Sequence, residues 1–195
     1  MILPEIPHTS PSFIMAYQID EKLCDMIVEN FEDVKKLTQY DKLRGYHRLP
    51  ESKLDSDILE NYMNAIKGAF ESYKKEYEWS NIMTVPWSFF PPFNIQRYDP
   101  GDAYNPTHIE DGGPRKGKIQ RKLAFTTYLN DINEGGETEF ILQGIKVKPK
   151  KGLTIIWPSD WMHTHRGVVD EENEKYIITG WYNLNVDRNV RYPWL

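Results

Sequence analysis

Two segments within about the first eighty residues carry apolar residues at the spacing of an amphipathic helix. The first begins after Asp20, a residue type whose side chain suits an N-cap. Its apolar positions are Leu23, Ile27, Phe31 and Val34. The second begins near Asp57, where Glu60 three residues later would form a reciprocal cap, and it ends at about Tyr77. Both segments predict helices that pack through one apolar face.

From about residue 81 the pattern changes to short β-rich runs separated by Gly, Pro, Asn and Asp. The expected strands cover residues 87–90, 93–98, 122–129, 137–142, 144–147, 153–157 and 176–184. The polar stretch 42–53, which contains Gly45 and Pro50, is typical of a long loop. Because no helical pattern separates the strands, they predict an antiparallel sandwich or barrel. We expect one domain over residues 1–195, with helical support over about 1–80 and a β core over about 81–195.

Composition narrows the class of protein. The 195 residues carry a net charge of −5, and 39% of them are hydrophobic, which is too apolar for a disordered chain. No run approaches the length of a membrane span, and the N-terminal residues lack a secretory signal pattern. Cys24 is the single cysteine, which excludes an intrachain disulfide and a thiolate zinc cluster. We therefore expect a cytoplasmic protein that binds neither membranes nor nucleic acid.

Histidine and carboxylate residues in the β-rich half suggest a metal site. His108 and Glu110 are two residues apart, so on a strand their side chains would point to the same face. His165, on a later strand, would complete a set of two histidines and one carboxylate. Such a set leaves about three positions of an octahedral metal open, as in non-haem iron(II) oxygenases. A His-x-Glu triplet is common by chance, so the interpretation depends on the surrounding sequence.

Ordered motifs surround these residues. They are residues 94–101 (NIQRYDPG), 104–110 (YNPTHIE), 121–131 (RKLAFTTYLND), 135–140 (GGETEF), 165–167 (HRG) and 175–181 (KYIITGW). In these motifs and their spacing, the sequence resembles the prolyl 4-hydroxylase branch of the iron(II)- and 2-oxoglutarate-dependent dioxygenases. The resemblance covers about residues 94–182, nearly half of the chain.

The resemblance implies a fold and a set of site residues. The fold is mainly β with flanking α-helices, a double-stranded β-helix (jelly roll) buttressed by the N-terminal helices. The implied iron ligands are His108, Glu110 and His165. Lys175 matches the basic residue that pairs with the distal carboxylate of 2-oxoglutarate, and a buried ammonium needs such an anion. The residues implied to line the cosubstrate pocket or to pack near the metal are Tyr98, Tyr128 and Trp181.

The implied activity is hydroxylation of an unactivated C–H bond, with release of succinate and CO₂. Peptidyl proline is the first expectation for the substrate, and a free amino acid or small metabolite is the alternative. The implied cofactors are Fe(II), 2-oxoglutarate and O₂, with ascorbate as a reductant. Arg121, Tyr104 and His163 are the weaker candidates for substrate contacts.

Several alternatives stay open at this point. Most relatives carry Asp where this chain has Glu110, and the adjacent Asp111 is a rival ligand that would need a bulge in the strand. A cupin-type metal site would use His163, His165 and Glu171 instead. A jelly-roll binding module without catalysis would bind no iron. The basic segment 111–121 and the stretch 42–53 are both candidate lids.

Overall fold

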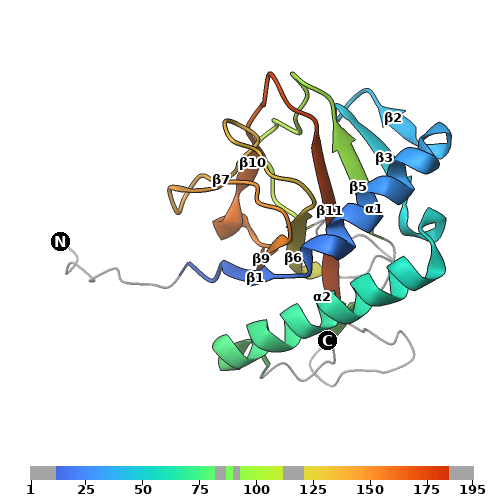
Figure 1. Cartoon of the computed structure of the whole chain (residues 1–195). Coiled ribbons are helices and arrows are strands. Elements are labelled where there is room, and N and C mark those ends of the chain that lie inside the picture. Colours follow the sequence, from blue (N-terminus) through green and yellow to red (C-terminus); the bar gives the residue numbers. More distant parts are fainter. Residues whose placement is uncertain (1–11, 82–86, 90–92, 112–120, 185–195) are drawn as a thin grey trace, which may run out of the picture.

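Two antiparallel sheets form the core of the protein, for which the computed structural model describes residues 12–81, 87–89, 93–111 and 121–184 (Figure 1). The larger sheet has the strand order β1-β9-β6-β11-β5-β3-β2, and β4 pairs with β11. Its strands are β1 (Met15–Gln18), β2 (Gln39–Asp41), β3 (Tyr46–Pro50), β4 (Trp87–Phe89), β5 (Asn94–Tyr98), β6 (Arg121–Tyr128), β9 (Leu153–Pro158) and β11 (Lys175–Leu184). The smaller sheet has the order β10-β7-β8. Its strands are β7 (Thr138–Phe140), β8 (Ile145–Val147) and β10 (His165–Gly167).

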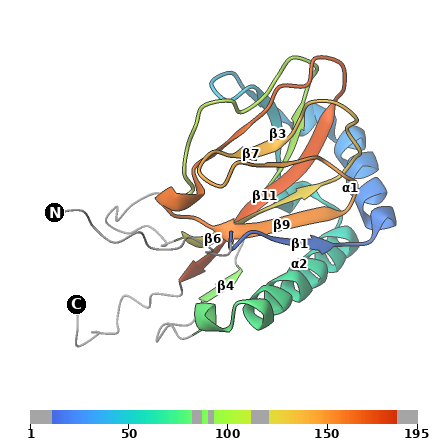
Figure 2. The same cartoon turned by 90° about the vertical axis from the view of Figure 1, so that its left-hand side faces the viewer.

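Both predicted helices are present and lie on one face of the larger sheet (Figure 2). Helix α1 (Glu21–Asp33) is capped by Asp20, whose carboxylate accepts from the Lys22 amide. Helix α2 (Ser56–Glu76) is capped by Asp55 rather than by the predicted Asp57. Their apolar faces share one buried cluster with the sheet, whose members include Ile27, Phe31, Tyr62, Ile66, Ile95, Phe125, Ile156 and Ile178. Burial of these side chains is the main force that joins the helices to the sheet.

Side chains on the central strands alternate between the two faces, as the strand period requires. On β6, Leu123 and Phe125 enter the helix-side cluster, whereas Ala124 and Tyr128 face the smaller sheet. The rings of Phe140 on β7 and Trp157 on β9 meet edge to face with their centroids 5.3 Å apart. The smaller sheet therefore covers the face of the larger sheet that the helices leave open, and the site lies between the two sheets.

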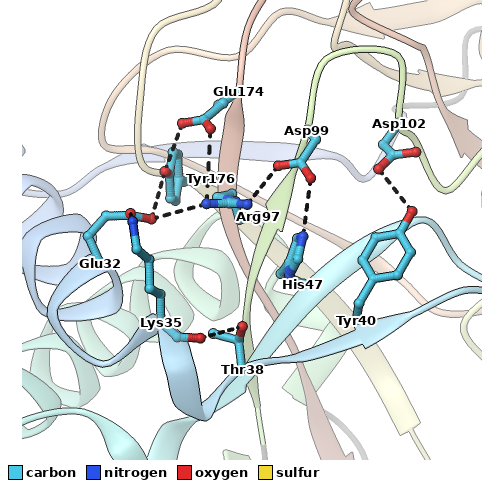
Figure 3. A network of polar contacts seen from close by, with 10 residues as sticks. All are labelled: Glu32, Lys35, Thr38, Tyr40, His47, Arg97, Asp99, Asp102, Glu174 and Tyr176. Carbon is cyan, nitrogen blue, oxygen red and sulfur yellow. Dashed lines mark hydrogen bonds and ion pairs between the residues drawn. The ribbon is translucent and has the colours of Figure 1, made fainter.

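A polar network ties α1 to the outer half of the sheet (Figure 3). Arg97 on β5 lies 2.8 Å from Asp99, 3.5 Å from Glu32 of α1 and 4.0 Å from Glu174. Tyr176 is the ladder partner of Arg97 on β11, and its hydroxyl lies 3.0 Å from a carboxylate oxygen of each glutamate, either of which can accept its one proton. The network lies on the side of β5 and β11 opposite to Tyr98 and Lys175, so it fixes two strands that carry site residues.

The predicted strands differ from the structure in a few places. Stretch 42–53 is not a long loop, because it contains β3, which pairs with both β2 and β5. The short strands β1 and β2 carry no sequence signal strong enough to predict them. The C-terminal end of the predicted strand 87–90 and most of the candidate lid 111–121 lie outside the described residues. Among the described helices, none is long and apolar enough to cross a membrane.

Candidate metal centre

His108 and His165 are held together by a short backbone bridge. The amide of each donates to the carbonyl of the other, at 2.9 and 3.0 Å. His165 begins β10, while His108 stands alone in this bridge and Glu110 follows in a bend rather than in a strand. Because the bridge aligns residues 57 positions apart in sequence, the two imidazoles lie 4.3 Å apart between ring centroids.

The three side chains converge on one point. The Glu110 Oε1 atom lies 3.6 Å from the Nε2 atom of His108 and 3.6 Å from the Nε2 atom of His165. Within the described residues, these three are the His, Cys, Asp or Glu side chains whose ligand atoms gather closely enough for a metal ion, all within 4.8 Å of one another. Three donor atoms gathered in this way are what binding of one metal ion requires.

Hydrogen bonds leave the inward nitrogen of each ring available as a ligand. His108 Nδ1 lies 2.9 Å from the Pro106 carbonyl, and His165 Nδ1 lies 2.8 Å from the His163 carbonyl. A carbonyl only accepts, so each Nδ1 carries a proton, and each Nε2 is the ring nitrogen that faces Glu110 and would bind a metal ion. Two imidazoles and one carboxylate beside an open cavity match the donor set of a non-haem Fe(II) site.

The carboxylate of Glu110 is ionised. Burial alone would raise its pKa, but the facing imidazoles of His108 and His165 lower the pKa of Glu110 below its ordinary value. Its second oxygen, Oε2, accepts from the Trp181 indole at 2.7 Å and from Arg121 at 3.3 Å. The lowered pKa favours the charged form of Glu110, which is the form that binds a metal ion.

Lys175 supplies a buried cation in the same cavity. Only 6% of the residue is exposed, and its Nζ donates to the Gly136 carbonyl at 3.1 Å. The ammonium also lies 4.8 Å from the ring centroid of Tyr98. Desolvation lowers the pKa of Lys175 to about 8, against the smaller opposing effects of Asp170 and Glu137. A buried ammonium whose charge is only weakly balanced by nearby carboxylates is suited to bind an anion.

The other aromatic candidates line the cavity in different ways. Tyr98 donates to the Gln96 side chain at 2.8 Å, and Tyr128 donates to Thr138 Oγ1 at 2.6 Å. Burial raises the pKa of both phenols, so they stay protonated. Tyr104 packs edge to face against His108, with ring centroids 4.5 Å apart. Tyr98, Tyr128, Trp181, Tyr104 and Arg121 all line the cavity, which has a volume of about 300 Å³.

His163 does not lie where the sequence suggested. It belongs to a 3₁₀ turn (Trp161–His163) instead of a strand, and it is not among the residues lining the cavity. Its ring lies 3.0 Å from Asp160 Oδ1 and 2.9 Å from the Ser12 carbonyl oxygen. The His-x-His pair therefore does not share a face, and the cupin-type set with Glu171 does not gather. Asp111 also lies outside the group of ligand atoms that converge.

Several polar residues of the cavity were not named as site candidates, although all of them except Arg44 lie within the sequence motifs. Gln96, Thr126, Thr138 and Thr179 line its walls, and Arg44 and Arg166 also lie along it. Gln96, Thr126 and Thr179 point into the cavity because they alternate with helix-facing residues on β5, β6 and β11. The sequence signal that could have identified these residues is a polar residue at every second position of an otherwise apolar strand.

Comparisons with known proteins agree with this geometry. Residues 93–183 match the family model of the 2OG-Fe(II) oxygenase superfamily. A probable prolyl 4-hydroxylase 9 of Arabidopsis thaliana is 32% identical over an alignment of 126 residues, which covers 50% of this chain and 42% of that protein. The chain thus spans less than half the length of this curated relative.

Solved structures share the fold. The viral collagen prolyl hydroxylase of Paramecium Bursaria Chlorella virus-1, in its 2OG complex, superposes with a TM-score of 0.68 over 88% of this chain and 96% of that one, at 20% identity. A Trichoplax adhaerens prolyl hydroxylase, in complex with a hypoxia inducible factor peptide fragment, superposes with a TM-score of 0.67 over 88% of this chain and 84% of that one, at 14% identity. The expected fold class, mainly β with antiparallel sheets and two helices, is confirmed.

Proposed function

Because residues 93–183 match the family model of the 2OG-Fe(II) oxygenase superfamily, we propose that the chain is an Fe(II)- and 2-oxoglutarate-dependent dioxygenase. The proposed reaction is hydroxylation of an unactivated C–H bond, with peptidyl proline as the substrate and succinate and CO₂ as co-products. The observation that carries the proposal is one cavity containing both a two-histidine, one-carboxylate set and a buried lysine.

In this proposal the three ligands hold Fe(II) and leave adjacent positions open on the cavity side. His108 and His165 bind through Nε2, because their Nδ1 protons are already held by backbone carbonyls. Glu110 binds through Oε1, and its charge offsets that of the ion. Fe(II) and 2-oxoglutarate, when bound, supply the oxidising chemistry that no side chain of the cavity provides.

The proposed role of Lys175 is to bind the distal carboxylate of 2-oxoglutarate. The ammonium lies in a buried position, where its attraction for a carboxylate is stronger than it would be in water. Tyr98 and Tyr128 shape the walls beside it, and their protonated hydroxyls add no negative charge that would repel a dianion. The cosubstrate would then be oriented from one end by Lys175 and from the other by the metal.

A peptide substrate is supported by the relatives. The Arabidopsis relative is named as a probable prolyl 4-hydroxylase, and the Trichoplax adhaerens enzyme of similar fold was solved with a peptide fragment. The prediction is tested by incubating the purified protein with Fe(II), 2-oxoglutarate, O₂ and a panel of proline-containing peptides. Mass spectrometry should detect one added oxygen on a proline, in step with succinate formation. If succinate formed only in the presence of free amino acids, the substrate would be a small molecule and not a peptide.

Four further expectations remain predictions. They are stimulation by ascorbate, a cytoplasmic location, a single domain over residues 1–195, and buttressing of the jelly roll by α1 and α2. The shared buried cluster of helices and larger sheet supports the last two. Omitting ascorbate from the assay above tests the first, since repeated turnover should then decline faster.

A further inference from the structure

The oxygen of Glu110 that faces away from the histidines is held by two donors. Trp181 Nε1 donates to Oε2 at 2.7 Å, and Arg121 approaches the same oxygen at 3.3 Å. Arg121 also donates to the backbone carbonyl of Glu110 at 3.0 Å. Both the side chain and the main chain of this one residue are therefore fixed by a single guanidinium.

The two donors also hold each other. The guanidinium carbon of Arg121 lies 3.5 Å from the ring centroid of Trp181, so the planar group stacks on the indole. Arg121 is the first residue of β6 and Trp181 lies on the adjacent β11, so both come from rigid strands rather than from loops. An indole fixed in this way donates in one direction, toward Oε2.

An irregularity in the sheet places Arg121 in the cavity. In a regular strand it would share the helix-side face of Leu123 and Phe125, because all three are odd-numbered. The register shifts between Tyr182 and Asn183 of β11, so that Asn183 pairs with Arg121 and no ladder partner is left for Lys122. This one-residue shift turns Arg121 to the cavity face, as a bulge does to a side chain.

We propose that Arg121 and Trp181 are positioning residues that clamp Glu110 as a metal ligand. A glutamate side chain has one more rotatable bond than an aspartate, and ordering that bond costs conformational entropy on metal binding. The clamp restricts this freedom before the ion arrives, and it directs Oε1 toward the two histidines. This inference rests on the proposed metal site, and it gives Arg121 a role in positioning the ligand Glu110.

The test is a Co(II) titration of the purified protein without cosubstrate, followed by visible absorption. Trp181→Phe keeps an aromatic ring but removes the donor, and Arg121→Gln removes the charge and the stack. Outer-shell substitutions of this kind weaken metal binding by about 10–100-fold, which is the loss expected for each variant. Trp161→Phe in the exposed 3₁₀ turn and Arg48→Gln on β3 are matched controls, since neither residue lines the cavity. Thermal unfolding of the metal-free variants checks that the fold is retained.

A double-mutant cycle separates positioning from mere packing. Glu110→Asp shortens the side chain by one methylene. The carboxylate then cannot reach both the metal ion and the two donors, Arg121 and Trp181. If the clamp acts through Glu110, the double variant Glu110→Asp/Trp181→Phe binds Co(II) little more weakly than Glu110→Asp alone. Two results would overturn the proposed clamp while leaving the metal site intact. One is a double variant whose loss of Co(II) affinity equals the product of the two single losses, and the other is wild-type Co(II) affinity in both Trp181→Phe and Arg121→Gln. A wild-type protein that binds no Co(II) would overturn the proposed function together with the clamp.

Discussion

Lys175 and Tyr98 are direct partners in the β11–β5 ladder, and their side chains meet inside the cavity, with the Lys175 Nζ 4.8 Å from the Tyr98 ring centroid. The aromatic face stabilises the cation without neutralising it. The ammonium therefore keeps its capacity to bind a carboxylate, and the ladder fixes its depth in the cavity. This relationship makes Lys175 the most informative residue for testing how the cosubstrate binds.

Replacing Lys175 by alanine should chiefly weaken binding of 2-oxoglutarate. The apparent KM for 2-oxoglutarate is expected to rise by at least about tenfold, because a charge-assisted hydrogen bond contributes roughly 1.5–3 kcal/mol. Steady-state succinate formation measures the effect, and Lys148→Ala, an exposed lysine, is the matched control. An unchanged KM for 2-oxoglutarate would assign the distal carboxylate to another residue.

Binding of 2-oxoglutarate should also weaken at alkaline pH. The pKa of Lys175 is lowered to about 8, so the cation is present below that pH and is lost as the pH rises through it. The dissociation constant should then increase toward about tenfold per pH unit, from a pH somewhat above 8 because the bound anion favours the charged form. Lys175→Arg keeps its charge at these pH values and should give a flatter profile. A flat profile in the wild type would contradict the role of this titration.

Burial of the charged Lys175 side chain also lowers the stability of the folded protein. Its folded pKa lies below the ordinary value, so the unfolded chain holds the proton more tightly, and stability rises with pH between about 8 and 10.5. Near neutral pH, Lys175→Met should raise the unfolding free energy of the metal-free protein by on the order of 1–3 kcal/mol. Urea unfolding measures this change. A less stable Lys175→Met variant would mean that the lysine contributes packing that outweighs its desolvation.

Sequence patterns predicted the parts of the fold that depend on local periodicity. Both helices and most of the central strands follow from apolar spacing, since a buried face leaves a regular trace along the chain. Strand β3 was missed because its residues (YHRLP) mix polar and apolar side chains and lie between Gly45 and a short 3₁₀ turn. Its strand identity comes from pairing with β2 and β5, which no local pattern reports.

The candidate site was predictable in its residues but not in its geometry. His108, Glu110 and His165 were named from their residue types and the family resemblance, Lys175 was named from the resemblance alone, and all four meet in one cavity. Glu110 lies in a bend and not on a strand, so strand alternation does not explain why its side chain converges with the two histidines. The positions of Arg121 and His163 depend on a register shift and on a 3₁₀ turn, which arise from long-range packing.

Replacing Arg97 should lower the stability of the fold without changing the affinity for a metal ion. Arg97→Leu leaves Glu32, Glu174 and Asp99 close together without their shared cation. Its loss is expected to cost about 1–3 kcal/mol of unfolding free energy, because partly buried carboxylates lose a charged donor. Chemical denaturation measures the cost, and Co(II) affinity in the same variant should stay near the wild-type value. A wild-type denaturation midpoint would show that the network is not a significant link between α1 and the sheet.

The most direct test of the central claim is an anaerobic titration of Fe(II) and 2-oxoglutarate into the purified protein, followed through the weak visible charge-transfer band of the chelated keto acid. The account predicts a band that needs both additions and that disappears in His108→Ala and His165→Ala while their fold is retained. Metal binding without such a band, or a band of wild-type intensity in both alanine variants, would contradict the assignment of this cavity as a 2-oxoglutarate-dependent iron site.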